Sequence, residues 1–227
     1  TESEEREALR REFTANVSHE LKTPLTSISG FAELMKEGDV PKETAADFSH
    51  SIYDEAQRLI TLVNDIIKIS ELDEKSIPAE KENVDLYELA NEIAARLKVE
   101  AAKKNVSMNV IGESAEIPGV RYILDEMIYN LCDNAIKYNK ENGIADIIIT
   151  SSDKKVSLTV RDTGIGIPPE HKSRVFERFY RVDKSHSKRV GGTGLGLAIV
   201  KHIVALHDAQ LNLESEIGKG TTITVTF

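Results

Sequence analysis

Several features that define common protein classes are scarce or missing in this chain. Its single cysteine, Cys132, excludes an internal disulfide and any metal site built from several cysteines. No apolar run approaches the roughly 20 residues needed to span a bilayer, and no secretory signal is present. The 29 Lys and Arg residues are outnumbered by 38 Asp and Glu, and the net charge of −9 argues against unspecific nucleic-acid binding, which needs clustered cations.

The remaining composition is that of a globular protein. Of 227 residues, 40% are hydrophobic and 30% are charged, and this length allows one large domain or two ordinary ones. We therefore expect a soluble, reduced and intracellular chain. Its start within a charged helical pattern suggests a fragment of a longer protein.

Residues 1–74 contain only two glycines and two prolines, and their apolar residues recur at helical spacing. The pattern predicts one helix that stops at residues 38–41 and a second with a heptad seam over residues 52–70. A further apolar stripe, Phe48, Leu62 and Ile69, flanks that seam. Because one hairpin cannot bury two stripes per helix, we expect an antiparallel hairpin that dimerises into a four-helix bundle.

From residue 77 onward the periodicity is mixed, which separates a domain over residues 1–76 from one over residues 77–227. Helices are expected after the N-cap Asp85, over residues 121–138 and from residue 191 to 206. Strands are expected at residues 108–111, 145–150, 156–160, 210–214 and 221–227. This order predicts a two-layer α/β sandwich with mostly antiparallel strands.

His19 is the first residue whose surroundings suggest chemistry. It points away from the apolar stripe of its helix, so the plain interpretation is a surface histidine. Glu20 can accept a hydrogen bond from one ring nitrogen and leave the other as a nucleophile, and Thr23 lies one turn further on the same face. Pro24 cannot donate to the carbonyl of Glu20, so we expect a bend beside the imidazole.

A second polar group shares one face of the helix predicted over residues 121–138. Asn130, Asn134 and either Lys137 or Tyr138 recur at helical intervals. Two carboxamides and an amine could hold a hydrated Mg²⁺ ion and triphosphate oxygens. Taken alone, such a set is usually a solvated helix face.

Two glycine-containing segments complete the candidate site. In residues 162–168, a strand ends in Asp162, which could accept the exocyclic amine of adenine, although in isolation a simple turn is the better interpretation of the segment. In residues 191–198, a glycine-rich loop opens a helix and offers N–H groups to an anion. This loop is neither a Walker loop, because no Gly-Lys-Ser/Thr follows, nor a Rossmann fingerprint, because no parallel βαβ strand precedes it.

In this order and spacing, the segments closely resemble the sensor histidine kinases of two-component signalling. The matching boxes are the phospho-acceptor box at 18–24, the asparagine box at 130–138, the glycine boxes at 162–168 and 191–197, and the phenylalanine box at 175–181. The resemblance implies a phosphotransfer hairpin followed by the Bergerat ATP-binding fold of gyrase, Hsp90 and MutL. One departure is His-Asp-Ala at residues 207–209, where the family often has His-Gly-Gly.

The resemblance also implies roles for individual residues. His19 would be the phosphorylated nucleophile, Glu20 would orient and deprotonate it, and Thr23 would position water for dephosphorylating the partner. Arg181 would reach the γ-phosphate, and Asn130 would ligate Mg²⁺. The ATP-binding set would be Asn130, Asn134, Lys137, Tyr138, Asp162, Gly164, Gly166, Ile167, Gly192, Thr193, Gly194, Leu195 and Gly196.

The implied activity is Mg²⁺- and ATP-dependent autophosphorylation of His19, followed by transfer to an aspartate of a response-regulator receiver domain. The partners would be a second copy of the chain and that receiver domain. A membrane would be reached only through upstream segments absent from this chain, which would be the cytoplasmic portion of a membrane-anchored bacterial sensor.

Two alternatives use the same residues. A nucleotide-driven conformational clamp would bind ATP without phosphorylating itself, and Glu126 occupies the place of the water-activating acid of such ATPases. A coiled-coil scaffold with an inactive nucleotide fold is the other alternative. An exposed His19 argues against the clamp, and the intact Asn130, Asp162 and glycine loops argue against the scaffold.

Overall fold

The computed structural model describes residues 2–38, 40–73, 80–152, 155–183 and 192–227. The chain separates into two compact units, Thr1–Ser70 and Glu71–Phe227. The domain boundary predicted between residues 76 and 77 lies outside the described residues, as does Gly191, the first residue of the predicted glycine-rich loop.

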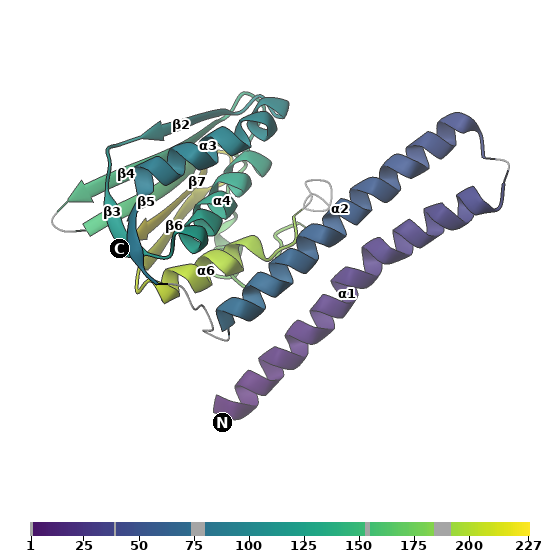
Figure 1. Ribbon diagram of the computed structural model, residues 1–227, viewed down its shortest axis with the longest axis horizontal. Coiled ribbons are helices and arrows are strands. Elements are labelled where there is room, and N and C mark those ends of the chain that lie inside the picture. Colours follow the sequence, from purple (N-terminus) through teal and green to yellow (C-terminus); the bar gives the residue numbers. More distant parts are fainter. Residues whose placement is uncertain (1, 39, 74–79, 153–154, 184–191) are drawn as a thin grey trace. The chain divides into compact units, whose positions relative to one another are not determined.

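The first unit is built from two long helices, α1 (Glu2–Lys36) and α2 (Lys42–Asp73) (Figure 1). The rings of Phe31 and Phe48 pack across the pair with centroids 5.2 Å apart. The helices are separated where the sequence predicts a stop, since Gly38 has a φ of +81°, which a helix does not allow. Helix α1 continues through Pro24 as a single helix.

Apolar side chains of the hairpin are only partly covered within one chain. On α2, the flanking residues Leu62 and Ile69 are buried, whereas Val63 of the heptad seam is 39% exposed. Several large apolar residues are about half exposed, among them Ile60 and Ile67 on the same helix. The hairpin therefore presents apolar surface that its own fold does not bury.

The second unit contains a five-stranded sheet in the order β2-β4-β5-β7-β6. Its strands are β2 Ser107–Ile111, β4 Ile144–Ser152, β5 Lys155–Asp162, β6 Gln210–Glu216 and β7 Gly220–Thr226. Strand β2 pairs with β4 in parallel, and the other pairs are antiparallel. A separate antiparallel pair, β1 (Glu82–Asp85) and β3 (Glu116–Gly119), is not predicted from the sequence pattern.

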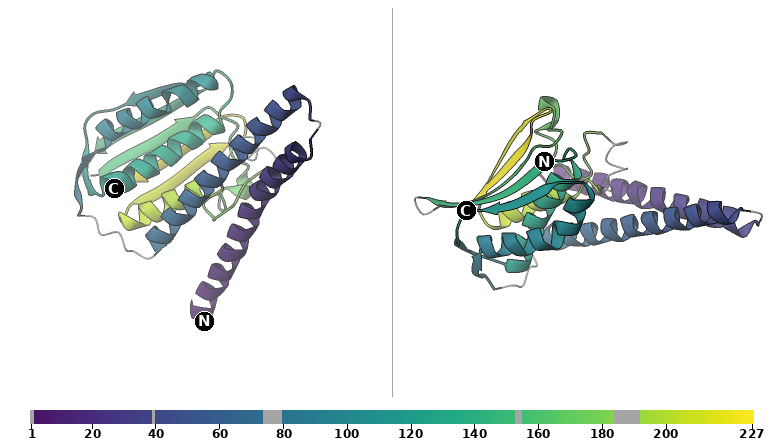
Figure 2. Two further views of the ribbon diagram at one scale, coloured as in Figure 1. Left: turned by 45° about the vertical axis from the view of Figure 1, so that its right-hand side comes forward. Right: turned by 90° about the horizontal axis from the view of Figure 1, so that it is seen from above.

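Three helices cover one face of this sheet, namely α3 (Leu86–Lys103), α4 (Arg121–Lys137) and α6 (Gly196–Leu206) (Figures 1 and 2). Asp85 caps α3 as predicted, accepting from the N–H groups of Tyr87 and Glu88 at 2.9 and 3.2 Å. Ala145, Ile147 and Ile149 alternate toward the helices and are buried. The predicted two-layer α/β sandwich is therefore confirmed.

Helix α6 begins at Gly196, later than the predicted start at residue 191. The reason lies in the loop before it, because Gly194 has a φ of +75° that no α-helix accommodates. A short 3₁₀ turn, Pro169–His171, precedes the aromatic segment that leads into this loop.

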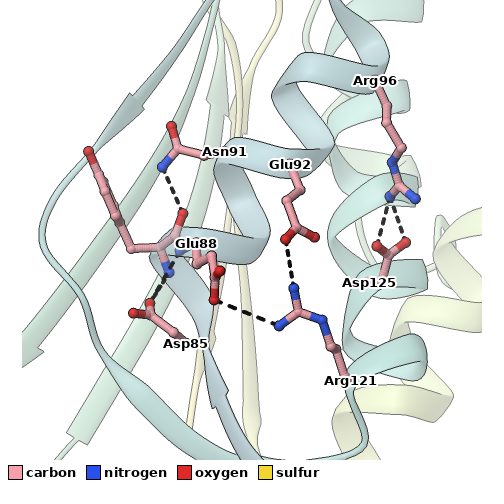
Figure 3. A network of polar contacts seen from close by, with 8 residues as sticks. Asp85, Glu88, Asn91, Glu92, Arg96, Arg121 and Asp125 are labelled. Carbon is pink, nitrogen blue, oxygen red and sulfur yellow. Dashed lines mark hydrogen bonds and ion pairs between the residues drawn. The ribbon is translucent and has the colours of Figure 1, made fainter.

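Ion pairs between α3 and α4 fix the helix that carries the asparagine box (Figure 3). Arg96 donates to both oxygens of Asp125 at 2.8 and 2.7 Å, and Arg121 donates to Glu92 at 2.8 Å. Each partly exposed pair contributes only about 0–1 kcal/mol. These ion pairs mainly position α4, since the Arg121–Glu92 and Arg96–Asp125 pairs hold successive turns of α4 against α3.

Candidate active site

Asp162 stands at the end of β5 with one carboxylate oxygen already occupied. Its Oδ1 accepts the N–H groups of Gly164 at 2.8 Å and Thr221 at 3.2 Å. Burial raises the pKa of this carboxyl to about 6, although the two N–H donors act in the opposite direction. Among the described residues, both hydrogen bonds go to Oδ1, so Oδ2 remains for the amine of a ligand.

The first glycine box packs its backbone against the end of α4. A Cβ on Gly164 would lie 2.3 Å from the carbonyl oxygen of Tyr138, which accepts the N–H of Ile165 at 3.0 Å. Only glycine permits this approach. Gly166 and Ile167 follow, and the N–H of Ile167 donates to the Ser215 hydroxyl at 2.8 Å.

On α4, Asn130 presents its amide group in a fixed orientation. Its Nδ2 donates to the Glu126 backbone carbonyl at 2.8 Å and to Glu126 Oε1 at 3.0 Å. Its Oδ1 lies 2.8 Å from the place that a Cβ on Gly196 would occupy. The asparagine oxygen therefore faces the N-terminus of α6, and the glycine there leaves room for it.

Lys137 lies at the other end of the polar face, bonded to Asp133 at 2.6 Å. Burial alone would lower its pKa, but the ion pair with Asp133 outweighs burial and the pKa is raised. Lys104 donates to the backbone carbonyl of Lys137 at 2.6 Å. Asn134 and Tyr138 are half-buried nearby on the same helix end. Phosphate contact by Lys137 stays a prediction, and the ammonium group has further N–H donors for it besides the one directed at Asp133.

The second glycine box is joined to the phenylalanine box by two hydrogen bonds. The N–H of Phe179 donates to the Gly194 carbonyl at 2.8 Å, and Arg181 Nη2 donates to the Thr193 carbonyl at 3.0 Å. Within the loop, the Thr193 hydroxyl accepts the N–H of Leu195 at 3.2 Å, and both residues are buried. Arg181 thus lies beside the loop predicted to bind phosphate, while its contact with the γ-phosphate stays a prediction.

The N-terminus of α6 fits an anion. This helix of 11 residues begins at Gly196, so its first N–H groups have no partner within the helix. Gly192 and Gly194 precede it in the loop. Phosphate oxygens bound at the N-terminus of α6 would face the Oδ1 atom of Asn130.

A Mg²⁺ ion would have to be shared between protein and nucleotide. Within the described ranges, no three His, Cys, Asp or Glu side chains are placed to hold a metal ion. Asn130 offers an amide oxygen, which is a ligand type that Mg²⁺ accepts together with phosphates and water. The residues present therefore fit a Mg²⁺–nucleotide complex.

The phospho-acceptor box lies in the other unit, on α1. His19 is exposed, as the helical wheel predicts, and Glu20 and Thr23 are half-buried beside it. The Thr23 hydroxyl donates to the backbone carbonyl of His19 at 3.2 Å. The structure thus brings His19, Glu20 and Thr23 together on one turn, while all predicted ATP-binding residues belong to the second unit.

Two supporting residues, Thr221 and Ser215, escape the sequence analysis, and Glu126 is named there only for the clamp alternative. Thr221 bonds Asp162, Ser215 bonds both Ile167 and the Gly220 carbonyl, and Glu126 bonds Asn130. For Thr221 and Ser215, the sequence offers only the small residues before β7. These residues predict a turn but no contact with the candidate site. The role of Thr221 depends on the pairing of β5 with β7, and that of Ser215 depends on the pairing of β6 with β7.

Comparison with known proteins decides the family. Residues 9–75 match the His Kinase A (phospho-acceptor) domain, and residues 119–227 match the histidine kinase-, DNA gyrase B- and HSP90-like ATPase family. The whole chain is 38% identical to the sensor protein kinase WalK of Staphylococcus epidermidis, of which it covers 38%. The chain belongs to the sensor histidine kinase family. The sensor histidine kinase WalK of Bacillus subtilis is 36% identical over the same shares of the two chains.

Solved histidine kinases share the fold. ThkA, in a complex with the response regulator protein TrrA, superposes with a TM-score of 0.78 and 26% identity, over 99% of this chain and 63% of that chain. AdeS of Acinetobacter baumannii gives a TM-score of 0.75 at 21% identity, over 92% of this chain and 96% of that chain, and shows the fold alone.

Among the residues that the structure describes, none of the helices combines the length and the apolar composition that a membrane-spanning helix needs.

Proposed function

We propose that this histidine kinase phosphorylates its own His19 from ATP and passes the phosphoryl group to an aspartate of a response-regulator receiver domain. The observation that carries the proposal is the combination of an exposed histidine on α1 with the carboxylate of Asp162, whose Oδ1 is occupied by the N–H groups of Gly164 and Thr221. Since the chain spans 38% of the length of each of the two curated relatives named above, the activity of the whole protein belongs to this proposal.

In the nucleotide slot, Asp162 Oδ2 accepts the exocyclic amine of adenine. Asn134, Lys137 and the first N–H groups of α6 hold phosphate oxygens, and Asn130 is the ligand for Mg²⁺. When bound, Mg²⁺ neutralises charge on the phosphates. Phosphoryl transfer depends mainly on positioning and on such charge neutralisation, which suits this set of amides and one or two cations.

At the acceptor, a ring nitrogen of His19 forms a bond to the γ-phosphorus. The bond from that phosphorus to the oxygen bridging to the β-phosphate breaks, and ADP leaves with this oxygen. Glu20 orients the imidazole and takes the proton from it. Thr23 then positions the water that removes phosphate from the phosphorylated receiver domain.

A second copy of the chain and a receiver domain are the proposed partners. The homodimer is supported by apolar residues that a single hairpin leaves open, such as Ile60 at 53% and Ile67 at 50% exposure. The receiver partner is supported by the likeness to ThkA, which was solved in complex with a response regulator protein. The greater length of the relatives leaves room for further segments, and we propose that such a segment attaches the protein to a membrane.

The test is incubation with ATP labelled on the γ-phosphate in the presence of Mg²⁺. We expect label that is lost in acid and kept in alkali, which is the behaviour of phosphohistidine. His19→Gln should abolish the label while nucleotide binding survives, because His19 lies outside the ATP unit. Label retained on another residue of the variant would overturn the assignment.

A further inference from the structure

Glu126 and Asn130 lie one turn apart on the polar face of α4. The amide nitrogen of Asn130 faces two acceptors on the same side, the backbone carbonyl and the Oε1 atom of Glu126, at 2.8 and 3.0 Å. Both groups are half-buried. The carboxylate of Glu126 thus adds a second, charged acceptor to the ordinary helix carbonyl.

An asparagine side chain can present either its oxygen or its nitrogen to a ligand, since the two ends have nearly the same size. With both acceptors on the Glu126 side, only the NH₂ end satisfies that side. The oxygen is then turned to the opposite side, where Oδ1 lies 2.8 Å from the Cβ position at Gly196. That side faces the N-terminus of α6, where a metal ion bound together with the nucleotide phosphates would need an oxygen ligand.

We propose that Glu126 is a positioning residue, whose carboxylate holds Asn130 with its oxygen toward the Mg²⁺ of bound nucleotide. This inference rests on the proposed function, because it assumes that Mg²⁺ and ATP occupy the slot. It gives Glu126 a different role from the one that the clamp alternative assigns. As a positioning residue Glu126 serves a side chain of the protein through Oε1, whereas a water-activating acid would accept a proton from water.

The decisive pair of variants is Glu126→Gln and Glu126→Leu. Glutamine keeps an acceptor oxygen of the same reach without a charge, so the orientation of Asn130 is retained. Leucine keeps a similar volume on α4 and removes the side-chain acceptor, so that only the backbone carbonyl of residue 126 remains to hold the amide nitrogen of Asn130. Glu100 on α3, an exposed residue paired with Lys103, provides matched controls as Glu100→Gln and Glu100→Leu.

The measurements are calorimetric ATP affinity with Mg²⁺ and with EDTA, and the Mg²⁺ concentration for half-maximal self-labelling. We expect Glu126→Leu to need about five- to tenfold more Mg²⁺, the effect of one lost hydrogen bond. Its affinity for ATP in EDTA should stay within about twofold of the parent. Glu126→Gln should keep the Mg²⁺ requirement of the parent within about twofold. A difference of this kind between the glutamine and leucine variants would not result from lost helix packing alone.

Each other result has a definite meaning. Equal Mg²⁺ requirements in the parent and both Glu126 variants would overturn the positioning role while leaving the kinase assignment intact. Glu126→Gln could also lose self-labelling as severely as Glu126→Leu while the Mg²⁺ requirement stays unchanged. This result would show that Glu126 acts as a base. A parent protein that binds no ATP with or without Mg²⁺ would overturn the proposed function and this inference together.

Discussion

At the scale of single residues, Asp162 shows how two backbone N–H groups prepare a carboxylate. They occupy Oδ1 and so fix which oxygen meets a ligand. Burial raises the pKa of the group to about 6, so near neutral pH the carboxylate is ionised and acts only as an acceptor. As the pH falls through about 6 the carboxyl gains a proton and loses that property.

We expect Asp162→Asn to weaken ATP binding by roughly ten- to a hundredfold at pH 7.5, the effect of one unpaired buried polar group. The amide oxygen of asparagine can keep both N–H donors, so its NH₂ group must take the place of Oδ2 and face the amine of adenine. Calorimetric titration checks the affinity. The parent should also lose affinity relative to the variant as the pH falls through about 6, and parallel pH profiles would contradict the role of Asp162.

Thr23 offers a second test, that of its proposed role in positioning water. Its hydroxyl proton is engaged in a hydrogen bond within α1. The hydroxyl donates to the carbonyl of His19 at 3.2 Å, which leaves its oxygen lone pairs to accept from a water. We expect Thr23→Ala to dephosphorylate the cognate receiver domain at least tenfold more slowly, on the scale of general catalytic contributions. Self-labelling of His19 should largely persist.

The assay for Thr23 follows the phosphorylated receiver domain over time in the presence of ADP. Thr26→Ala is the matched control, since Thr26 is exposed on the same helix and its hydroxyl donates to the Lys22 carbonyl in the same manner. If Thr23→Ala and Thr26→Ala behave alike, or if self-labelling falls in step with dephosphorylation, the division of labour between Glu20 and Thr23 is wrong.

At the scale of elements, His207 joins the end of α6 to the start of α4. Its Nδ1 bonds the Ile203 carbonyl at 2.8 Å, and its Nε2 accepts the N–H of Val120, the residue that caps α4, at 3.4 Å. Burial lowers the pKa of the ring. Lys81 lowers it further, while the Ile203 carbonyl and Asp208 raise it.

The sign of the pH effect follows from the lowered pKa of His207. The folded state favours the neutral ring, so this contribution to stability is present above the ordinary pKa of about 6.5 and is lost as the pH falls below it. We expect His207→Gln to flatten the decline in thermal stability between about pH 7 and 5 relative to the parent. Thermal unfolding at several pH values checks this, with exposed His50→Gln as a control that should follow the parent.

Much of this architecture is predictable from the sequence because α3, α4 and the long strands carry regular patterns and caps. The pair β1–β3 is not predictable, since each strand has four residues and β3 contains Pro118. The box residues Asn130 and Asp162 are recognised by spacing. Their partners Glu126 and Thr221 need three-dimensional information, because a side-chain rotamer and the β5–β7 pairing decide those contacts.

At the scale of the whole molecule, apolar residues on one face of α2 indicate a second chain. Ile60, Val63 and Ile67 recur at helical spacing and are 53%, 39% and 50% exposed. A carboxylate placed in an apolar interface would be buried without a partner. We expect the double variant Ile60→Glu and Ile67→Glu to be monomeric in sedimentation at concentrations where the parent is dimeric.

Nucleotide affinity of the double variant should match the parent, because all proposed ATP-binding residues belong to the other unit. Thr61→Glu, which introduces the same charge at an exposed polar position of α2, should remain dimeric. A dimeric double variant would show that this face of α2 is not the interface.

The strand order has a consequence for how the kinase folds during synthesis. Strand β7 follows β6 in the sequence but lies between β5 and β6 in the sheet, so β6 joins the sheet only through β7. Thr221, which orients Asp162, enters with that strand. A nascent chain that already displays both helices of the hairpin therefore lacks the Thr221 hydrogen bond of the proposed adenine site until residues 220–226 have left the ribosome. Adenine nucleotide binding can accordingly serve as a marker for the completed sheet.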